Sequence, residues 1–224
     1  MRDRIYLLLL IILFLPLIGQ SSENIFFQTN TGVTNPLNSP TLSNYYNKGV
    51  IMSSGIGYII NNQLALIGRV SYTYFRFREY YPSIIPFFIH EGYIWNSWSN
   101  FGGFKVEKTY LLEFSVNLKA SQFKTNGILH PFISLGIGYL IQRIGNVEVT
   151  LMEFINSGGK HIFQLPGTGK SDNDFSLNFG AGIEARISKR FNFFVEGRLL
   201  MKRNLLTNYH SNNVYIPVEF GIRF

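Results

Sequence analysis

The residues whose types and spacing could do chemistry are few, and the first group suggests phosphate binding. The segment GTGKS at 167–171 has the closing letters of a P-loop, in which backbone amides and a lysine hold phosphate. The full motif needs a glycine five residues before Gly169, where this chain has Gln164, and a helix directly afterwards. Asp172 and Asn173 follow instead, and a strand-like pattern begins behind them. We therefore interpret the segment as a flexible loop tip.

The histidines are the second group with chemical potential. His210 directly precedes Ser211, a combination that suggests a base beside a nucleophile. Adjacent side chains of a strand point to opposite faces, however, so His210 is poorly placed to activate Ser211. His90, His130 and His161 lie far apart in the sequence, without the spacing of metal ligands. The sequence therefore predicts a protein that is not an enzyme, with no metal and no cofactor.

The composition indicates which kind of fold must position these residues. Charged residues make up 15% of the 224-residue chain, whereas about 25% is usual for a soluble domain. Aromatic residues reach 16%, and no apolar run of about 20 residues follows the N-terminus, as a membrane-spanning helix would require. The chain has no cysteine, which excludes disulfides, thiolate metal sites and a lipoprotein anchor.

The N-terminus has the pattern of a secretory signal peptide. Two arginines lie among the first four residues, residues 5–18 are apolar except for one tyrosine and one proline, and 19–21 (GQS) offers a small-x-small cleavage site. A membrane anchor is the alternative, but this apolar stretch is short for a span. We expect residues 1–21 to be the signal peptide and residues 22–224 to form one barrel domain.

After residue 22, apolar residues recur at every second position, which is the period of β-strands with one apolar face. In the last segment the even-numbered residues from Val214 to Phe224 are apolar, while Glu219 and Arg223 share the other face. Most segments reach the 9–11 residues of a tilted membrane-crossing strand. The eight predicted strands cover residues 25–33, 48–60, 64–78, 110–119, 131–146, 175–187, 192–202 and 213–224.

The predicted connections alternate between short and long, as in outer-membrane barrels. An even number of strands returns the C-terminus to the side where the mature chain begins. Short turns are expected at 61–63, 120–130 and 188–190. Long loops are expected at 34–47, 79–104, 147–172 and 204–212.

Alternation alone does not say which face of the barrel points outward, but the glycines do. A three-residue turn at 188–190 pairs Gly182 with Glu196 and Gly180 with Arg198. The turn at 61–63 likewise pairs Gly55 with Arg69. The interior of an eight-stranded barrel is just wide enough for side chains to fill, so a charged residue opposite glycine indicates a crowded interior.

The charged face is therefore predicted to form the lumen, and the apolar face to contact lipid. Four acids and four bases on that face can neutralise one another without water. Arg198 is expected near Glu184, Glu196 and Glu219, and to couple to Glu196. The alternative is a soluble barrel with eight solvated surface charges. The predicted lumen network comprises Arg69, Glu113, Glu184, Arg186, Glu196, Arg198, Glu219 and Arg223.

Glycine-rich strand motifs carry a family resemblance. GIGY at 55–58 and again at 136–139, with GAGI at 180–183, resembles the strands of the OmpA/OmpX type of small outer-membrane barrel. The alternating C-terminus, with Phe220, Ile222 and a final Phe224, is similar to the signal that the outer-membrane assembly machinery recognises. The resemblance implies an all-β, eight-stranded up-and-down transmembrane barrel in the bacterial outer membrane, with a filled lumen and that machinery as a partner.

The second long loop, 79–104, is too apolar for an ordinary solvated loop and is a candidate interaction surface for an extracellular ligand. The alternative is that it folds over the barrel mouth or lies at the membrane interface, where Trp and Tyr are favoured. The residues of this candidate surface are Tyr80, Tyr81, Phe87, Phe88, Tyr93, Trp95 and Trp98.

The charge balance points to an anionic membrane surface as a partner. The chain carries a net charge of +7, and loss of the signal peptide, with its two arginines and one aspartate, leaves +6. An exported protein does not meet nucleic acid, so lipopolysaccharide-type anionic lipids are the expected partner. Basic residues gather near the predicted loop ends: Lys48, Arg76, Arg78, Lys105, Lys108, Lys202 and Arg203.

The sequence thus predicts a monomeric, non-enzymatic outer-membrane barrel whose surface loops serve envelope integrity or contact with a ligand, surface or host molecule. Two alternatives remain. Some small barrels of this type deacylate lipid A with a His, a Ser and an acid, although this chain matches their pattern only loosely at 210–211. A narrow pore is the other alternative.

Overall fold

The fold is taken from a computed structural model. It describes residues 24–37, 39–78, 89–90, 93–94, 101–121, 127–152, 160–165, 167–188, 191–202 and 213–224. The predicted signal peptide at 1–21 lies outside the described residues.

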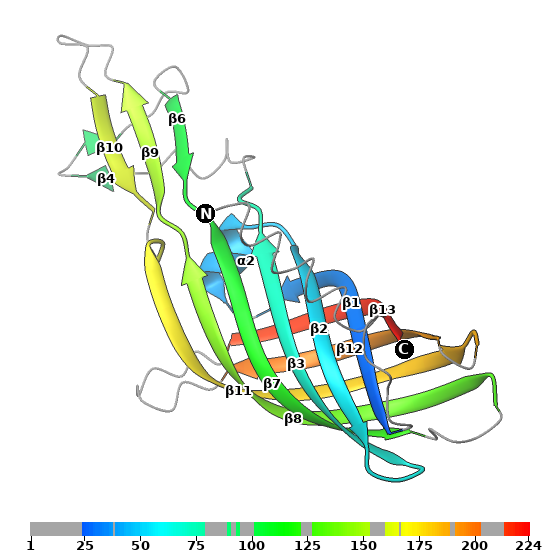
Figure 1. The fold of residues 1–224 in the computed structure, drawn as a ribbon. Helices are drawn as coiled ribbons and strands as arrows, with labels where there is room; N and C mark the ends of the chain where they lie inside the picture. Colours follow the sequence, from blue (N-terminus) through cyan, green and yellow to red (C-terminus); the bar gives the residue numbers. More distant parts are fainter. Residues whose placement is uncertain are drawn as a thin grey trace, which may run out of the picture.

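Eight antiparallel strands form a closed barrel in the order β1-β13-β12-β11-β8-β7-β3-β2 (Figure 1). Strands that follow one another around the barrel also follow one another in the sequence, and β1 pairs with β13 to close it. The predicted eight-stranded up-and-down barrel is therefore confirmed. The strands are β1 (Ile25–Pro36), β2 (Gly49–Ile59), β3 (Leu64–Phe75), β7 (Thr109–Ser121), β8 (Leu129–Ile144), β11 (Lys170–Arg186), β12 (Asn192–Lys202) and β13 (Asn213–Arg223).

The hairpin registers match those expected from turn length. Gly182 lies opposite Glu196 and Gly180 opposite Arg198 in the β11–β12 pair. In the β2–β3 pair, Gly55 lies opposite Arg69. A methyl group at Gly180 would lie 2.6 Å from the Glu196 carboxylate, so Gly180 leaves room for the charged side chain beside it.

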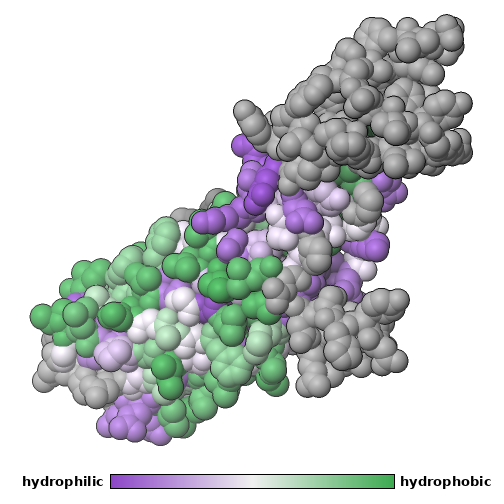
Figure 2. Space-filling model, turned by 180° about the vertical axis from the view of Figure 1, so that it is seen from behind, coloured by the Kyte–Doolittle hydropathy of each residue, from purple (hydrophilic) through white to green (hydrophobic). Residues whose placement is uncertain are grey.

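The polarity of the barrel is inverted relative to that of a water-soluble one. Large apolar residues point outward, among them Ile137, which is 67% exposed, and Phe175, which is 62% exposed. Arg198 and Glu219 point inward and are 2% and 0% exposed. Figure 2 shows the apolar residues spread over the barrel wall, with hydrophilic residues gathered beyond it. The prediction of a lipid-facing apolar exterior and a charged lumen is confirmed, because a soluble barrel would expose its charges.

Two of the predicted long loops contain β-structure. β6 (Phe101–Val106), β9 (Val147–Met152) and β10 (Lys160–Gln164) form a three-stranded sheet in the order β10-β9-β6. β4 (Ile89–His90) and β5 (Tyr93–Ile94) pair separately. The sheet projects from the end of the barrel opposite the C-terminus (Figure 1). The stretch 147–172, which was expected to be a long loop, therefore contains β9 and β10. Its last residues, from Lys170, belong to β11.

The barrel end from which this sheet projects is here named the mouth, and the opposite end, with the turns at 61–63 and 188–190, the turn end. The predicted loop 34–47 contains the short helix α2 (Pro40–Tyr45), which lies at the mouth (Figure 1). Leu42 and Tyr46 are buried there, and the Tyr46 ring packs edge-on against Phe77 with 5.7 Å between centroids. Among the described residues, no helix is long and apolar enough to cross a membrane.

Candidate functional site

The middle of the lumen is filled by ionised side chains that are almost fully buried. The Nε of Arg198 donates to Oε1 of Glu219 over 2.7 Å, and its Nη1 lies 3.4 Å from Oε2 of Glu113. Neutral side chains also donate hydrogen bonds to both carboxylates: Asn178 donates to Glu113 over 2.7 Å, and Ser53 donates to Glu219 over 2.9 Å. One guanidinium from β12 therefore bridges acids on β7 and β13.

A second ion pair crosses the lumen. Nη2 of Arg69 on β3 lies 2.7 Å from Oε2 of Glu196 on β12, and Ser134 donates to the other oxygen of Glu196 over 2.9 Å. The partner expected for Arg198 was Glu196, and this expectation is wrong for the direct contact. Glu196 faces Glu219 on the next strand, so the two acids bind different arginines.

The third group lies toward the turn end, around Glu184. Lys119 Nζ lies 2.8 Å from one carboxylate oxygen of Glu184, and Arg223 Nη2 lies 2.6 Å from the other. Asn192 donates to Glu184 over 2.6 Å. Arg186, which was expected in the network, is half-buried at the end of β11 and forms no ion pair with the residues that the structure describes.

Sequence reasoning missed Lys119 as a member of this network. The signal was present, because Lys119 shares its face of the strand with Glu113 in the alternating pattern. Its ammonium group also lies 3.7 Å from the centre of the Phe132 ring, a cation–π contact that helps to hold a charge away from water.

Apolar layers lie at both ends of the network. At the turn end, Phe26 and Ile67 are buried, and Phe132 packs edge-on against Phe194 with 6.4 Å between centroids. At the mouth a larger buried cluster contains Leu42, Tyr46, Phe75, Phe77, Leu111, Leu140, Ile144, Val147, Val149, Leu165, Leu200 and Tyr215. Because the charged side chains are buried, pairing and hydrogen bonds must offset the desolvation of each charge.

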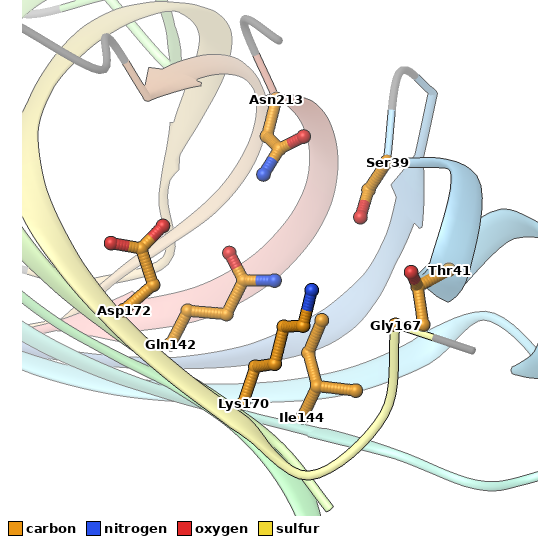
Figure 3. A pocket seen from close by; sticks show the side chains of 8 residues that line it. All are labelled: Ser39, Thr41, Gln142, Ile144, Gly167, Lys170, Asp172 and Asn213. Atoms are coloured by element: carbon orange, nitrogen blue, oxygen red, sulfur yellow. The ribbon is translucent and has the colours of Figure 1, made fainter. Parts of the chain in front are cut away.

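A pocket of about 170 Å³ lies at the mouth, above the apolar cluster (Figure 3). Its lining comprises Ser39, Thr41, Gln142, Ile144, Gly167, Lys170, Asp172 and Asn213. Figure 3 shows Lys170, Gln142 and Asn213 directed into this space. The amides, the hydroxyls and the ammonium group could hold water or a small polar molecule.

The position of Lys202 contradicts one expectation about lipid contact. It was grouped with basic residues that would meet the membrane surface, but it is 2% exposed and bound to Asp172 beside the mouth pocket. It points inward because the alternation of β12 places it on the same face as Glu196 and Arg198. Arg203 lies outside the described residues.

The segment 167–171 is an ordered turn and not a flexible loop tip. Gly167 and Gly169 adopt φ angles of 80° and 71°, in the region that favours glycine. The buried hydroxyl of Thr168 accepts from the Val147 amide over 3.3 Å and donates to the Leu165 carbonyl over 2.7 Å. Lys170 then begins β11, so a strand stands where a P-loop requires a helix.

The histidines occupy separate places. His130 is buried on β8 opposite Glu184, whereas His90 and His161 lie in β4 and β10. In the described part of the chain, no three His, Cys, Asp or Glu side chains are grouped as metal ligands would be. His210 and Ser211 lie outside the described residues.

Most of the candidate interaction surface in the second long loop also falls outside the described residues. This holds for Tyr80, Tyr81, Phe87, Phe88, Trp95 and Trp98. Tyr93 belongs to β5, where only its backbone is described. That surface therefore stays a prediction.

The C-terminal residues complete the closure of the barrel. Phe220 and Ile222 point outward from β13 and are 52% and 43% exposed. The Phe224 amide donates to the Phe27 carbonyl over 2.9 Å, and the Phe27 amide donates back over 2.8 Å. The last residue thus joins the final strand to the first.

Together, the closed eight-strand barrel, the apolar exterior and the filled charged lumen define the fold of the small outer-membrane β-barrels. No protein-family model matches the chain, and no curated protein sequence matches it. Many solved structures are similar, among them the following three. Neisserial surface protein A is 14% identical, with a TM-score of 0.48 over 89% of this chain and 95% of that one.

The attachment invasion locus protein Ail of Yersinia pestis is 14% identical, with a TM-score of 0.44 over 91% of this chain and all of that one. The outer-membrane enzyme PagL is 14% identical, with a TM-score of 0.43 over 89% of this chain and 98% of that one. At such low TM-scores these likenesses carry no conclusion about activity.

Proposed function

We propose that the protein is a monomeric integral protein of the bacterial outer membrane, in which a sealed and non-enzymatic barrel anchors β-structure outside the cell. One observation carries the proposal: buried charged and apolar side chains fill the lumen, with apolar clusters toward the turn end and at the mouth. The predicted signal peptide at 1–21 and the apolar barrel wall support the location.

The projecting sheet is the part of the molecule best suited to contact with a ligand, a surface or a host molecule. Val147 and Val149 of β9 are buried in the mouth cluster, so the sheet is packed onto the barrel. On its exposed surface, Lys105 Nζ lies 3.3 Å from Oε2 of Glu148. A sheet held in this way is displayed at a fixed position, which favours binding because little order is lost on association.

The location is tested by fractionation. The mature protein should leave the envelope fraction only with detergent and show β-type circular dichroism. Unboiled protein should migrate differently from boiled protein on a denaturing gel. A protein that is freely soluble as a monomer without detergent would contradict the membrane location.

Sealing is tested in planar lipid bilayers, with a general porin inserted under the same conditions as the positive control. The folded protein should give no unitary current steps, because buried charged and apolar side chains fill the lumen. Regular steps from the folded protein would establish the narrow pore and overturn the sealed anchor.

Catalysis is tested by mass spectrometry of lipid A from cells with and without the gene. The acylation pattern should be the same in both. An acyl chain that is lost only when the gene is present would establish a lipid A deacylase and overturn the non-enzymatic proposal.

A further inference from the structure

A tyrosine cluster marks the upper edge of the apolar wall on one side of the barrel. Tyr74 on β3 lies directly opposite Tyr110 on β7, and the rings of Tyr72 and Tyr110 stack with 5.7 Å between centroids. Tyr139 on the neighbouring strand β8 lies nearer the turn end, opposite Phe114 of β7, and is 37% exposed. Tyrosines in such a girdle occupy the interface between the hydrocarbon and the headgroups of a membrane.

Basic residues follow the tyrosines on the same outward faces. Arg76 lies two residues beyond Tyr74, and the side chains on both sides of Arg76 are buried. Lys108 lies two residues before Tyr110, and Arg143 is the direct partner of Tyr110 across the β7–β8 pair. Two residues of a strand correspond to about 7 Å. Arg76 and Lys108 therefore lie about one headgroup layer above the tyrosines.

Lys48, just before β2, extends this arrangement to a fourth neighbouring strand. The four exposed residues Lys48, Arg76, Lys108 and Arg143 are here named the cationic row. Neighbouring strands lie about 4.8 Å apart, so the row extends over roughly 15 Å of the barrel circumference. Among the described residues, the carboxylate of Glu107 accompanies the row, and its Oε2 lies 3.8 Å from Nη2 of Arg143.

In the described part of the chain, the cationic row lies on one side of the barrel. Among the described residues, the outward positions near the mouth on β1, β11, β12 and β13 carry no charge; they include Asn35, Ser171, Asn173, Met201 and Ile216. Within the described residues, the charge is therefore gathered on the ends of β2, β3, β7 and β8 and is not spread evenly around the mouth. A local anionic partner is the better explanation.

We propose that the cationic row binds the phosphate groups of a single class of partner, a phosphorylated outer-leaflet lipid of the lipid A type, with the tyrosines packed against its apolar part. The proposal rests on the membrane location proposed above. Guanidinium and ammonium groups are the usual protein ligands of phosphate. A free phosphate ion would not contact the tyrosines, whereas a lipid would contact both the tyrosines and the cationic row.

The test uses the full mature protein folded into phosphatidylcholine nanodiscs, with EDTA present to remove bridging divalent cations. Native mass spectrometry then measures the retention of lipid A with two phosphates against the same lipid after dephosphorylation. The wild type should prefer the phosphorylated lipid. Arg76→Gln and Lys108→Gln should each weaken this preference about fivefold, as expected for one cation near an anionic interface.

Lys105→Gln is the matched control, because it removes the same charge three residues from Lys108 but on the projecting sheet, where the side chain is 80% exposed. It should leave the preference unchanged. Equal losses for Lys105→Gln and Lys108→Gln would overturn the proposal in favour of a net-charge effect. Complete competition by inorganic phosphate would overturn the commitment to a lipid.

The outcomes separate this proposal from the proposed location. Protein that does not fold into nanodiscs at all contradicts the membrane location. Protein that folds but retains both lipids equally contradicts only the cationic row.

Discussion

Arg198 and Glu219 lie on neighbouring strands, β12 and β13, and meet inside the barrel with 2.7 Å between the guanidinium Nε and the carboxylate Oε1. Both side chains are almost completely buried. Glu113 lies on the other side of the same guanidinium. Arg198 is thus the cation that holds two carboxylates away from water, and its loss has a predictable cost.

Replacing Arg198 with Ala should destabilise the barrel by about 3–5 kcal/mol, because the change leaves buried carboxylates without their cation. Water that enters the vacated space should reduce this loss. The double variant Arg198→Ala/Glu219→Ala should recover part of the loss, since the effects of coupled residues are not additive. The measurement is reversible urea unfolding in detergent or lipid.

Lys105→Ala serves as the control for this prediction, because its pair with Glu148 is exposed and should contribute only about 0–1 kcal/mol. A loss for Arg198→Ala as small as that for Lys105→Ala would mean that the charged face meets water. The barrel would then be inside out.

The glycines of the lumen should be intolerant of even one methyl group. In Gly182→Ala the new methyl would lie 2.2 Å from the Val195 carbonyl oxygen, so the backbone must shift. We expect a destabilisation of about 1–3 kcal/mol. Gly197→Ala is the matched control, because its methyl would point outward and meet no described atom within 4 Å. If both variants unfold at the same urea concentration, lumen crowding is not what selects Gly182.

Deleting Phe224 should reduce the amount of folded protein in the outer membrane while export across the inner membrane continues. The deletion removes both backbone hydrogen bonds to Phe27 and the aromatic end of the predicted assembly signal. Heat-modifiable protein in envelope fractions is the readout. Phe175→Ala, which removes an equally apolar exposed ring elsewhere on the wall, should leave the yield near wild type. An unchanged yield after the deletion would remove the case for a terminal signal.

Alkaline pH should loosen the mouth through Tyr46. Burial raises the pKa of the Tyr46 hydroxyl above its ordinary value, although a hydrogen bond with Thr109 opposes the shift. A raised pKa means that the folded state resists ionisation. The resulting stability is complete below about pH 10, the pKa of an unfolded-chain tyrosine, and is lost as pH rises through the folded value. Urea midpoints between pH 8 and pH 11 should therefore fall more for wild type than for Tyr46→Phe. Parallel curves would show that Tyr46 does not ionise differently in the two states.

Local patterns of the chain were sufficient to predict the barrel. The period of two places each residue on one of two faces, and a three-residue turn sets the register of its hairpin without reference to the rest of the fold. This is why the pairs Gly182–Glu196 and Gly55–Arg69 followed from counting residues. The location of charge inside the barrel followed from the same glycines.

Only the tertiary structure decided which acid meets which base, because contacts across a lumen depend on how the strands are staggered around the closed barrel. The pairing of Arg69 on β3 with Glu196 on β12, and of Arg198 on β12 with Glu113 on β7, could not be read from any single hairpin. The inward position of Lys202 did follow the alternation of β12, but its partner Asp172 lies on the neighbouring strand β11. Local patterns did not predict the packing at the mouth either. Leu42 and Val147 are apolar residues in predicted loops, and both are buried in the same cluster.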